Sequence, residues 1–173
     1  MKLFRKSLIL AVAMVAFICG GASAQVSFNA QGKVLVPGVM SQYTNTYSYF
    51  NSYLLLSNIT NQDVHVKVTY YGHDGQDVTS LGVLSTGSYS TGGGVVDSSS
   101  NGEFTIPAYS TRNFAIQNRP NQHCVLGHAT IAWNSDDPKM TRALIGIVRY
   151  NSKNGNSSAA LGGAFPINNG QPW

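Results

Sequence analysis

The chain has 173 residues, of which 43% are hydrophobic and 10% are charged, and its 11 Lys and Arg against 7 Asp and Glu give a formal net charge of +4. Three of the basic residues precede an apolar run near the N-terminus, so the rest of the chain is almost neutral. The remaining basic residues are scattered singly, which excludes the clustered basic face that nucleic-acid binding requires.

Residues 1–24 have the pattern of a signal peptide. A basic start is followed by an apolar run from Leu8 to Ile18 and by the small residues Ala22-Ser23-Ala24. The run is too short to span a bilayer comfortably, so we expect cleavage before Gln25, no stable membrane anchor, and a secreted or periplasmic location. Residues 25–173 are long enough for one domain with a sizeable core.

After Gln25, short runs of β-branched and aromatic residues alternate with Gly, Asn, Ser, Asp and Pro, and no helical period persists. This pattern predicts an all-β domain, a single antiparallel β-sandwich or small barrel of eight or nine strands. The expected strands cover residues 33–36, 52–57, 64–71, 77–84, 102–106, 111–117, 124–133, 142–150 and 159–166.

The connections between these strands carry their own signals. Residues 58–63 are expected to join the second and third strands into an antiparallel hairpin, and the Asp74-Gly75 pair favours a tight hairpin turn after the third. Residues 85–101 consist mostly of Ser, Gly and Thr around Val95-Val96, which predicts a flexible loop.

Cysteine and acidic residues give little support for a metal or cofactor. Cys19 leaves with the signal peptide, so Cys124 cannot form an intramolecular disulfide, and we expect a buried core thiol. Cys124 and His128 would lie ~13 Å apart on an extended strand, too far to hold one ion. Asp74 with Asp77, and Asp136 with Asp137, are explained by turns, although a weak calcium site at either pair stays open.

No pattern supports catalysis. The chain lacks the Gly-x-Ser-x-Gly turn of a serine hydrolase, and no spacing selects the carboxylate pair that a glycosidase needs. We therefore expect a protein that is not an enzyme and has no cofactor.

Tyrosines are the most distinctive side chains of the domain. Tyr43, Tyr47, Tyr49 and Tyr53 lie close together among Thr, Asn and Ser residues. Rings flanked by amides and hydroxyls suit a surface that binds sugar or protein. Their shared parity also fits a row that lines the core, which is the interpretation we favour over the binding face.

Three segments resemble the sensory rhodopsin transducer family and related small β-sandwich proteins. They are the runs 53–58 (YLLLSN), 63–71 (DVHVKVTYY) and 104–108 (FTIPA). The resemblance implies a compact sandwich that assembles into oligomers and binds a partner. This chain differs from the family in its predicted signal peptide, which argues against a cytoplasmic signalling role. The resemblance assigns no site residue.

The sequence thus predicts an exported, non-enzymatic binding or structural surface protein. The segments 26–30 and 159–165 are nearly uncharged and suit pairing with a second copy, with Trp173 docked on its own sheet or in the contact. The partner would be another copy, a glycan or a cell-surface protein. The alternative is a carbohydrate-binding module that uses the tyrosines, and an exported hydrolase ranks third.

Overall fold

The computed structural model describes residues 28–45, 48–87, 94–97, 101–116, 124–155 and 161–173. The described chain is almost entirely β-structure, with two short 3-10 helices, η1 (Thr79–Leu81) and η2 (Ile167–Gly170). Its strands are β1 (Gly32–Asn45), β2 (Ser48–Asn58), β3 (Val64–Tyr71), β4 (Gly82–Gly87), β5 (Gly94–Asp97), β6 (Glu103–Ile106), β7 (Thr111–Ile116), β8 (Val125–Asn134), β9 (Leu144–Asn154) and β10 (Leu161–Pro166). Every ladder is antiparallel.

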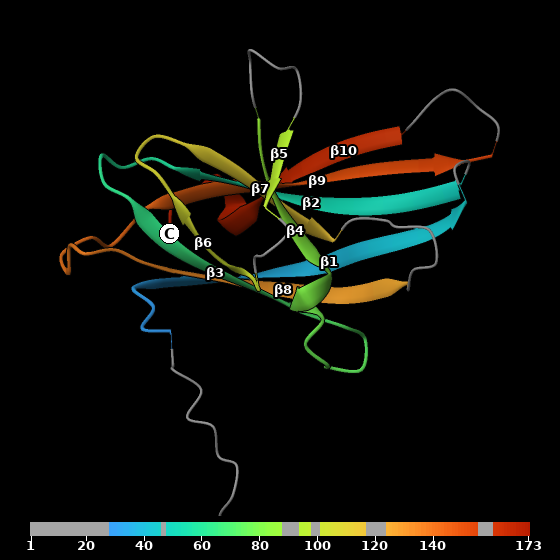
Figure 1. The fold of residues 1–173 in the computed structure, drawn as a ribbon, viewed down its shortest axis with the longest axis horizontal. Helices are drawn as coiled ribbons and strands as arrows, with labels where there is room; N and C mark the ends of the chain where they lie inside the picture. Colours follow the sequence, from blue (N-terminus) through green and yellow to red (C-terminus); the bar gives the residue numbers. More distant parts are fainter. Residues whose placement is uncertain (1–27, 46–47, 88–93, 98–100, 117–123, 156–160) are drawn as a thin grey trace, which may run out of the picture.

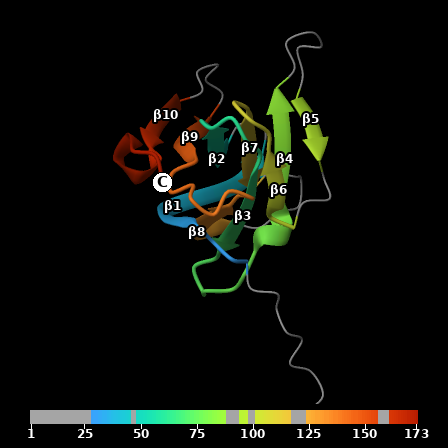
Figure 2. The same ribbon diagram turned by 90° about the vertical axis from the view of Figure 1, so that its left-hand side faces the viewer.

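The strands form one sheet that folds back on itself into two layers (Figures 1 and 2). One layer has the order β1-β8-β3-β6, and the other has the order β10-β9-β2-β7-β4-β5. The layers are joined because the end of β1 pairs with the start of β2, from Ser41 opposite Asn51 to Asn45 opposite Ser48. The result is a curled antiparallel sheet, a half-barrel, which confirms the predicted all-β fold.

The core lies between the layers and follows the alternation of the strands. On β3, residues Val64, Val66, Val68 and Tyr70 are buried, while the residues between them are half-buried or exposed. Rings connect the layers: Phe114 of β7 stacks on Tyr70 of β3 at 5.5 Å and on Phe104 of β6 at 5.6 Å between centroids. Each layer thus buries one face against the other.

Eight of the nine predicted strands are present with altered bounds, whereas the strand predicted over residues 77–84 is wrong for 77–81, which form one bridge and η1 before β4 begins at Gly82. β1 extends well beyond the predicted residues 33–36, through a bulge at Gly38, which has a φ of 70°. β5 lies within residues 85–101, which were predicted to be a flexible loop; this is wrong for residues 85–87 and 94–97, which pair as β4 and β5. Residues 88–93 and 98–100 lie outside the described part of the chain.

The predicted hairpin between residues 52–57 and 64–71 is wrong. β2 pairs with β1, β7 and β9, whereas β3 pairs with β6 and β8, so the connection crosses from one layer to the other. The Asp74-Gly75 turn does form, with a φ of 79° at Gly75 and one bridge between Tyr71 and Asp77. The chain then leaves β3 through η1, because β4 pairs with β5 and β7.

A buried amide fixes the crossing between the layers. The side-chain amide of Asn58 donates to the carbonyl oxygens of Gln62 (2.7 Å), Ile106 (3.0 Å) and Pro107 (3.1 Å). Its own carbonyl oxygen accepts from the backbone N–H of Thr60 (2.9 Å) and from the Thr60 hydroxyl (2.8 Å). Asn58 is 2% exposed, so this full set of partners removes the cost of burying a polar group.

Residues 1–24, the predicted signal peptide, lie outside the described residues. Within the residues that the structure describes, no helix has the length and apolar character needed to cross a membrane.

Candidate functional site

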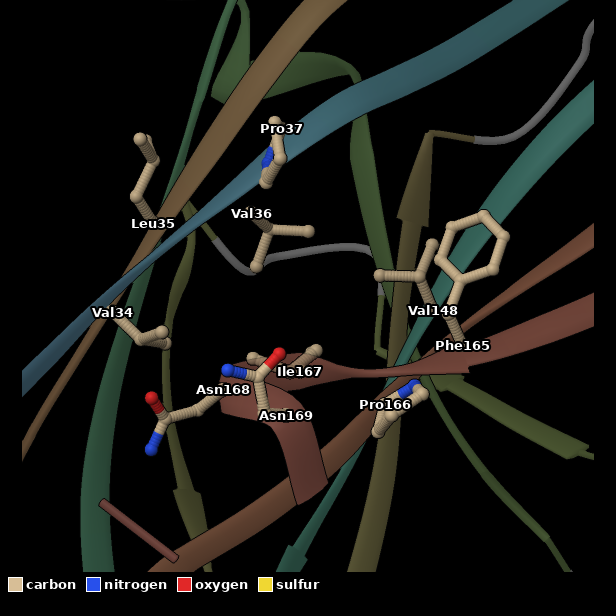
Figure 3. Close-up of a pocket in the computed structure, with 10 residues that line it drawn as sticks. All are labelled: Val34, Leu35, Val36, Pro37, Val148, Phe165, Pro166, Ile167, Asn168 and Asn169. Carbon is tan, nitrogen blue, oxygen red and sulfur yellow. The ribbon is translucent and has the colours of Figure 1, made fainter. Parts of the chain in front are cut away.

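An apolar groove lies between β1 and the segment formed by β10 and η2 (Figure 3). Its volume is about 340 Å³. The lining side chains carry no charge: Val34, Leu35, Val36, Pro37, Val148, Phe165, Pro166, Ile167, Asn168 and Asn169. A groove with this lining suits an uncharged, apolar ligand because a charged group placed there would lose water without gaining a partner.

The groove exists because two strand edges lie on either side of it. β1 pairs with β8 along residues 32–41, and its other edge pairs with β2 only from Ser41 onward. β10 pairs with β9 and, among the described residues, with no strand on its other edge. Unpaired edges of this kind present backbone N–H and C=O groups that can accept another strand.

Aromatic and aliphatic side chains form the walls. Phe165 is 48% exposed, and its ring meets Tyr150 edge-on at 4.4 Å between centroids; Tyr150 in turn contacts Phe50 at 5.4 Å. On the β1 side, Leu35 is 58% exposed. Large apolar groups therefore remain exposed at the mouth of the groove, which is a feature of interaction sites.

A left-handed turn contributes Asn168 and Asn169 to the lining of the groove. Asn168, Asn169 and Gly170 have φ angles of 51°, 52° and 77°, and the Asn168 side-chain amide donates to the Gln171 carbonyl oxygen at 3.1 Å. Asparagine tolerates this backbone region better than most residues, because its short polar side chain can bond locally. The Asn168 and Asn169 amides are the polar groups at the groove (Figure 3).

Trp173 is docked on its own chain, which is one of the two predicted alternatives. It is 8% exposed and belongs to the core. Its carbonyl oxygen accepts from the N–H groups of Ala143 (2.9 Å) and Leu144 (3.2 Å), and its own N–H donates to the Leu144 carbonyl oxygen (3.1 Å). The chain end thus anchors η2 beside β9, and a role of Trp173 in self-association stays a prediction.

The predicted tyrosines do not form one row in the core. Tyr43 and Tyr49 lie opposite each other on β1 and β2 and are half-buried, as is Tyr53. On β2, Leu54 and Leu56 are fully buried, so Tyr49 and Tyr53 lie on the other face of that strand. The core-lining interpretation therefore fails for Tyr49 and Tyr53, and Tyr47 lies outside the described residues.

Tyr53 lines a second, smaller pocket. Its volume is about 280 Å³, and its lining consists of Tyr53, Leu55, Ser85, Thr86, Gly87, Asn113 and Arg149. Strands β2, β4, β7 and β9 all contribute to it. Its lining includes the polar side chains of Ser85, Thr86 and Asn113 and the charged side chain of Arg149, whereas the groove lining carries no charge.

The predicted turn carboxylates have turn roles. The carboxylate of Asp77 accepts from the N–H of Thr79 (2.8 Å), that of Asp74 accepts from the N–H of Gln76 (3.1 Å), and that of Asp137 accepts from the N–H of Lys139 (2.9 Å). Throughout the described ranges, no three His, Cys, Asp or Glu residues lie together as a group that could hold a metal ion.

Cys124 is exposed, so the expectation of a buried thiol is wrong. Cys124 directly precedes β8, and Val125 at the start of that strand is 5% exposed. Because successive residues of an extended chain point to opposite sides, burial of Val125 directs Cys124 outward. Farther along β8, His128 stacks on Tyr71 at 5.1 Å.

The groove residues were only partly anticipated by the sequence. The uncharged segment 159–165 indicated β10 as a pairing edge, whereas nothing pointed to Leu35 or to the Asn168-Asn169 turn. Val34 and Phe165 lie at opposite ends of the domain sequence, and only the fold brings their strands to one groove.

Comparison with known proteins gives no family. No protein-family model matches the chain, and no curated protein matches it. A solved structure, the crystal structure of Thermotoga maritima 1070, matches with a TM-score of 0.48 at 10% identity, covering 81% of this chain and 95% of that one. The resemblance to the sensory rhodopsin transducer family stays an untested prediction.

Proposed function

We propose that the chain is an exported, non-enzymatic binding protein that self-associates through β10, and that a second copy provides the strand that covers the groove. The observation that supports this most is the uncharged open edge of β10 directly beside an apolar groove. β10 has the sequence LGGAFP, with no charge and no bulge along its edge, and its one proline, Pro166, stands at the end of the strand.

Two copies of an edge strand can pair antiparallel about a twofold axis, because the same surface then serves both partners. Gly162 and Gly163 carry no side chain, so a second backbone can approach this part of β10 closely. Phe165 lies opposite Val148, on the face of the sheet that includes the groove. In such a pair, the inner side chains of the second β10 cover the groove of the first.

The chemistry of the groove selects this partner over a charged one. Its ten lining residues include no Lys, Arg, Asp or Glu. The β10 segment of a second copy is equally uncharged, so neither surface brings an unpaired charge into the contact. Burial of the Phe165 ring, now 48% exposed, adds apolar area to the backbone hydrogen bonds.

Sedimentation velocity of the mature chain over the micromolar range tests the proposal. We expect a reversible dimer whose dissociation constant rises roughly tenfold or more in Phe165→Asp, because the substitution places a charge in the contact. Leu126→Asp is the matched control: Leu126 is also an exposed strand residue, at 50% exposure, and it lies on β8. A monomer throughout, or equal weakening by both variants, would refute pairing through β10.

A further inference from the structure

The polar pocket at Tyr53 has a chemistry of its own, which does not depend on self-association through β10. We propose that it is a binding site for an acidic sugar, a pyranose that carries a carboxylate. Two features of the pocket support this: an aromatic ring beside a cation that no described carboxylate pairs, and a side-chain amide held in one orientation.

Tyr53 and Arg149 are direct neighbours across the β2–β9 ladder. Directly opposite side chains in an antiparallel pair lie close enough to act on one ligand. The ring of Tyr53 is half-buried and its neighbour is exposed. The Tyr53 hydroxyl accepts from the Asn51 side-chain amide at 3.5 Å, and the ring can pack against the C–H face of a pyranose.

Arg149 supplies the charge. Within the described part of the chain, the ion pair that forms joins Lys67 to Glu103, so no described carboxylate neutralises Arg149. A guanidinium presents paired N–H donors whose spacing matches a carboxylate, which makes it a selective group for an acidic ligand. Neighbouring strands bring no acidic side chain to the pocket lining.

Asn113 forms the oriented amide. Across the ladders it lies opposite Leu55 on β2 and Ser85 on β4, and its side-chain N–H donates to the Ser85 hydroxyl at 2.9 Å. Its side-chain carbonyl oxygen is buried and has no hydrogen-bond partner. The bond to Ser85 therefore fixes the orientation of the Asn113 side chain at the pocket wall.

An acidic sugar matches both groups. Its carboxylate can accept from Arg149, and its apolar face can pack on Tyr53. A neutral sugar would leave Arg149 without a partner, and a simple carboxylic acid would leave Tyr53 unused. The pocket volume of about 280 Å³ suits one or two sugar rings of a longer chain.

Isothermal titration and amide NMR shifts with tetragalacturonate, compared with the neutral cellotetraose, test this site in the full mature chain. We expect tetragalacturonate to bind roughly ten to a hundred times more tightly than cellotetraose. Its binding should weaken by a similar factor in Arg149→Met and in Tyr53→Ala, and the shifted amides should include those of β2 and β9 around the pocket.

The control is Arg142→Met, which removes an equal charge from an exposed residue away from the pocket. Unchanged near-ultraviolet circular dichroism confirms that each variant is folded, and Tyr53→Leu, which also removes the ring, serves if Tyr53→Ala is not. Equal binding of both oligosaccharides, equal effects of Arg149→Met and Arg142→Met, or no binding at millimolar sugar would each overturn the proposal. Because Arg149 also lies opposite Ala164 on β10, sedimentation velocity of Arg149→Met checks that a loss of sugar binding is not a change of oligomeric state.

Discussion

Cys124 lies directly before β8, and this position determines the exposure and reactivity of its thiol. The thiol is exposed although the strand that follows is largely buried. We expect a thiol reagent to label native Cys124 about as fast as it labels the unfolded chain. Cys124→Ser should change the free energy of unfolding by less than about 0.5 kcal/mol, as at other surface positions. Labelling that requires denaturant would contradict the exposed position.

Tyr70 shows the opposite situation, a titratable group held deep in the core. Its hydroxyl donates to the Phe114 carbonyl oxygen at 3.0 Å, and burial strongly raises the pKa of the phenol. The folded state therefore keeps this proton at alkaline pH, where the unfolded chain loses it. Folding stability is retained up to the unfolded pKa near 10 and falls above it, by about 1.4 kcal/mol per pH unit for this group.

Chemical denaturation between neutral pH and pH 11 measures this effect. Tyr70→Phe should reduce the alkaline slope and cost about 1–3 kcal/mol at neutral pH, because the Phe114 carbonyl oxygen loses its donor. Tyr109→Phe is the control, since Tyr109 is 74% exposed. An alkaline slope that is the same in both variants would rule out Tyr70 as its source.

At the scale of elements, one side chain fixes the corner where β2 leaves its layer. The side-chain N–H groups of Asn58 donate to three carbonyl oxygens, and its side-chain oxygen accepts two hydrogen bonds from Thr60. Asn58→Asp should destabilise more than Asn58→Ala, because a carboxylate would face carbonyl oxygens in a buried site. We expect a loss of about 2–4 kcal/mol for Asn58→Ala in urea unfolding. Asn61 is exposed, so Asn61→Ala is the control variant. If Asn58→Ala lowers the free energy of unfolding no more than Asn61→Ala does, Asn58 does not fix this corner.

Strands were predictable where side chains alternate, and strand partners were not. The period of β3 can be read directly from residues 64–71, because each apolar residue enters the core. The choice of partner depends on the opposite layer: β2 has the turn signals of a hairpin with β3, yet it pairs with β1, β7 and β9. β5 was missed because its composition resembles a loop, while pairing with β4 supplies its order.

At the scale of the whole molecule, the proposed function requires export. The apolar run and Ala22-Ser23-Ala24 predict a mature protein that begins at Gln25. Intact mass spectrometry of the exported material should give the mass of residues 25–173 without lipid. Material that retains residues 1–24, or that carries an acyl chain at Cys19, would show that the predicted processing is wrong.

The candidate sites are products of the assembled fold. The groove combines β1 with β10, and the polar pocket combines four strands, so no local motif could reveal either. The sequence pointed to one contributor of each, the uncharged segment 159–165 and Tyr53. Arg149 and Asn113 carry no sequence signal, since single polar residues in strands are common on any solvated face.

Pairing of β10 with a second copy is the central claim, and backbone amide hydrogen exchange of residues 161–165 tests it most directly. The amides on the open edge of β10 should exchange rapidly in dilute protein and slow down as the concentration rises through the micromolar range, because the second strand accepts their hydrogen bonds. Phe165→Asp should abolish this dependence. Exchange in β10 that stays the same at every concentration would contradict the account, whatever the oligomeric state of the protein.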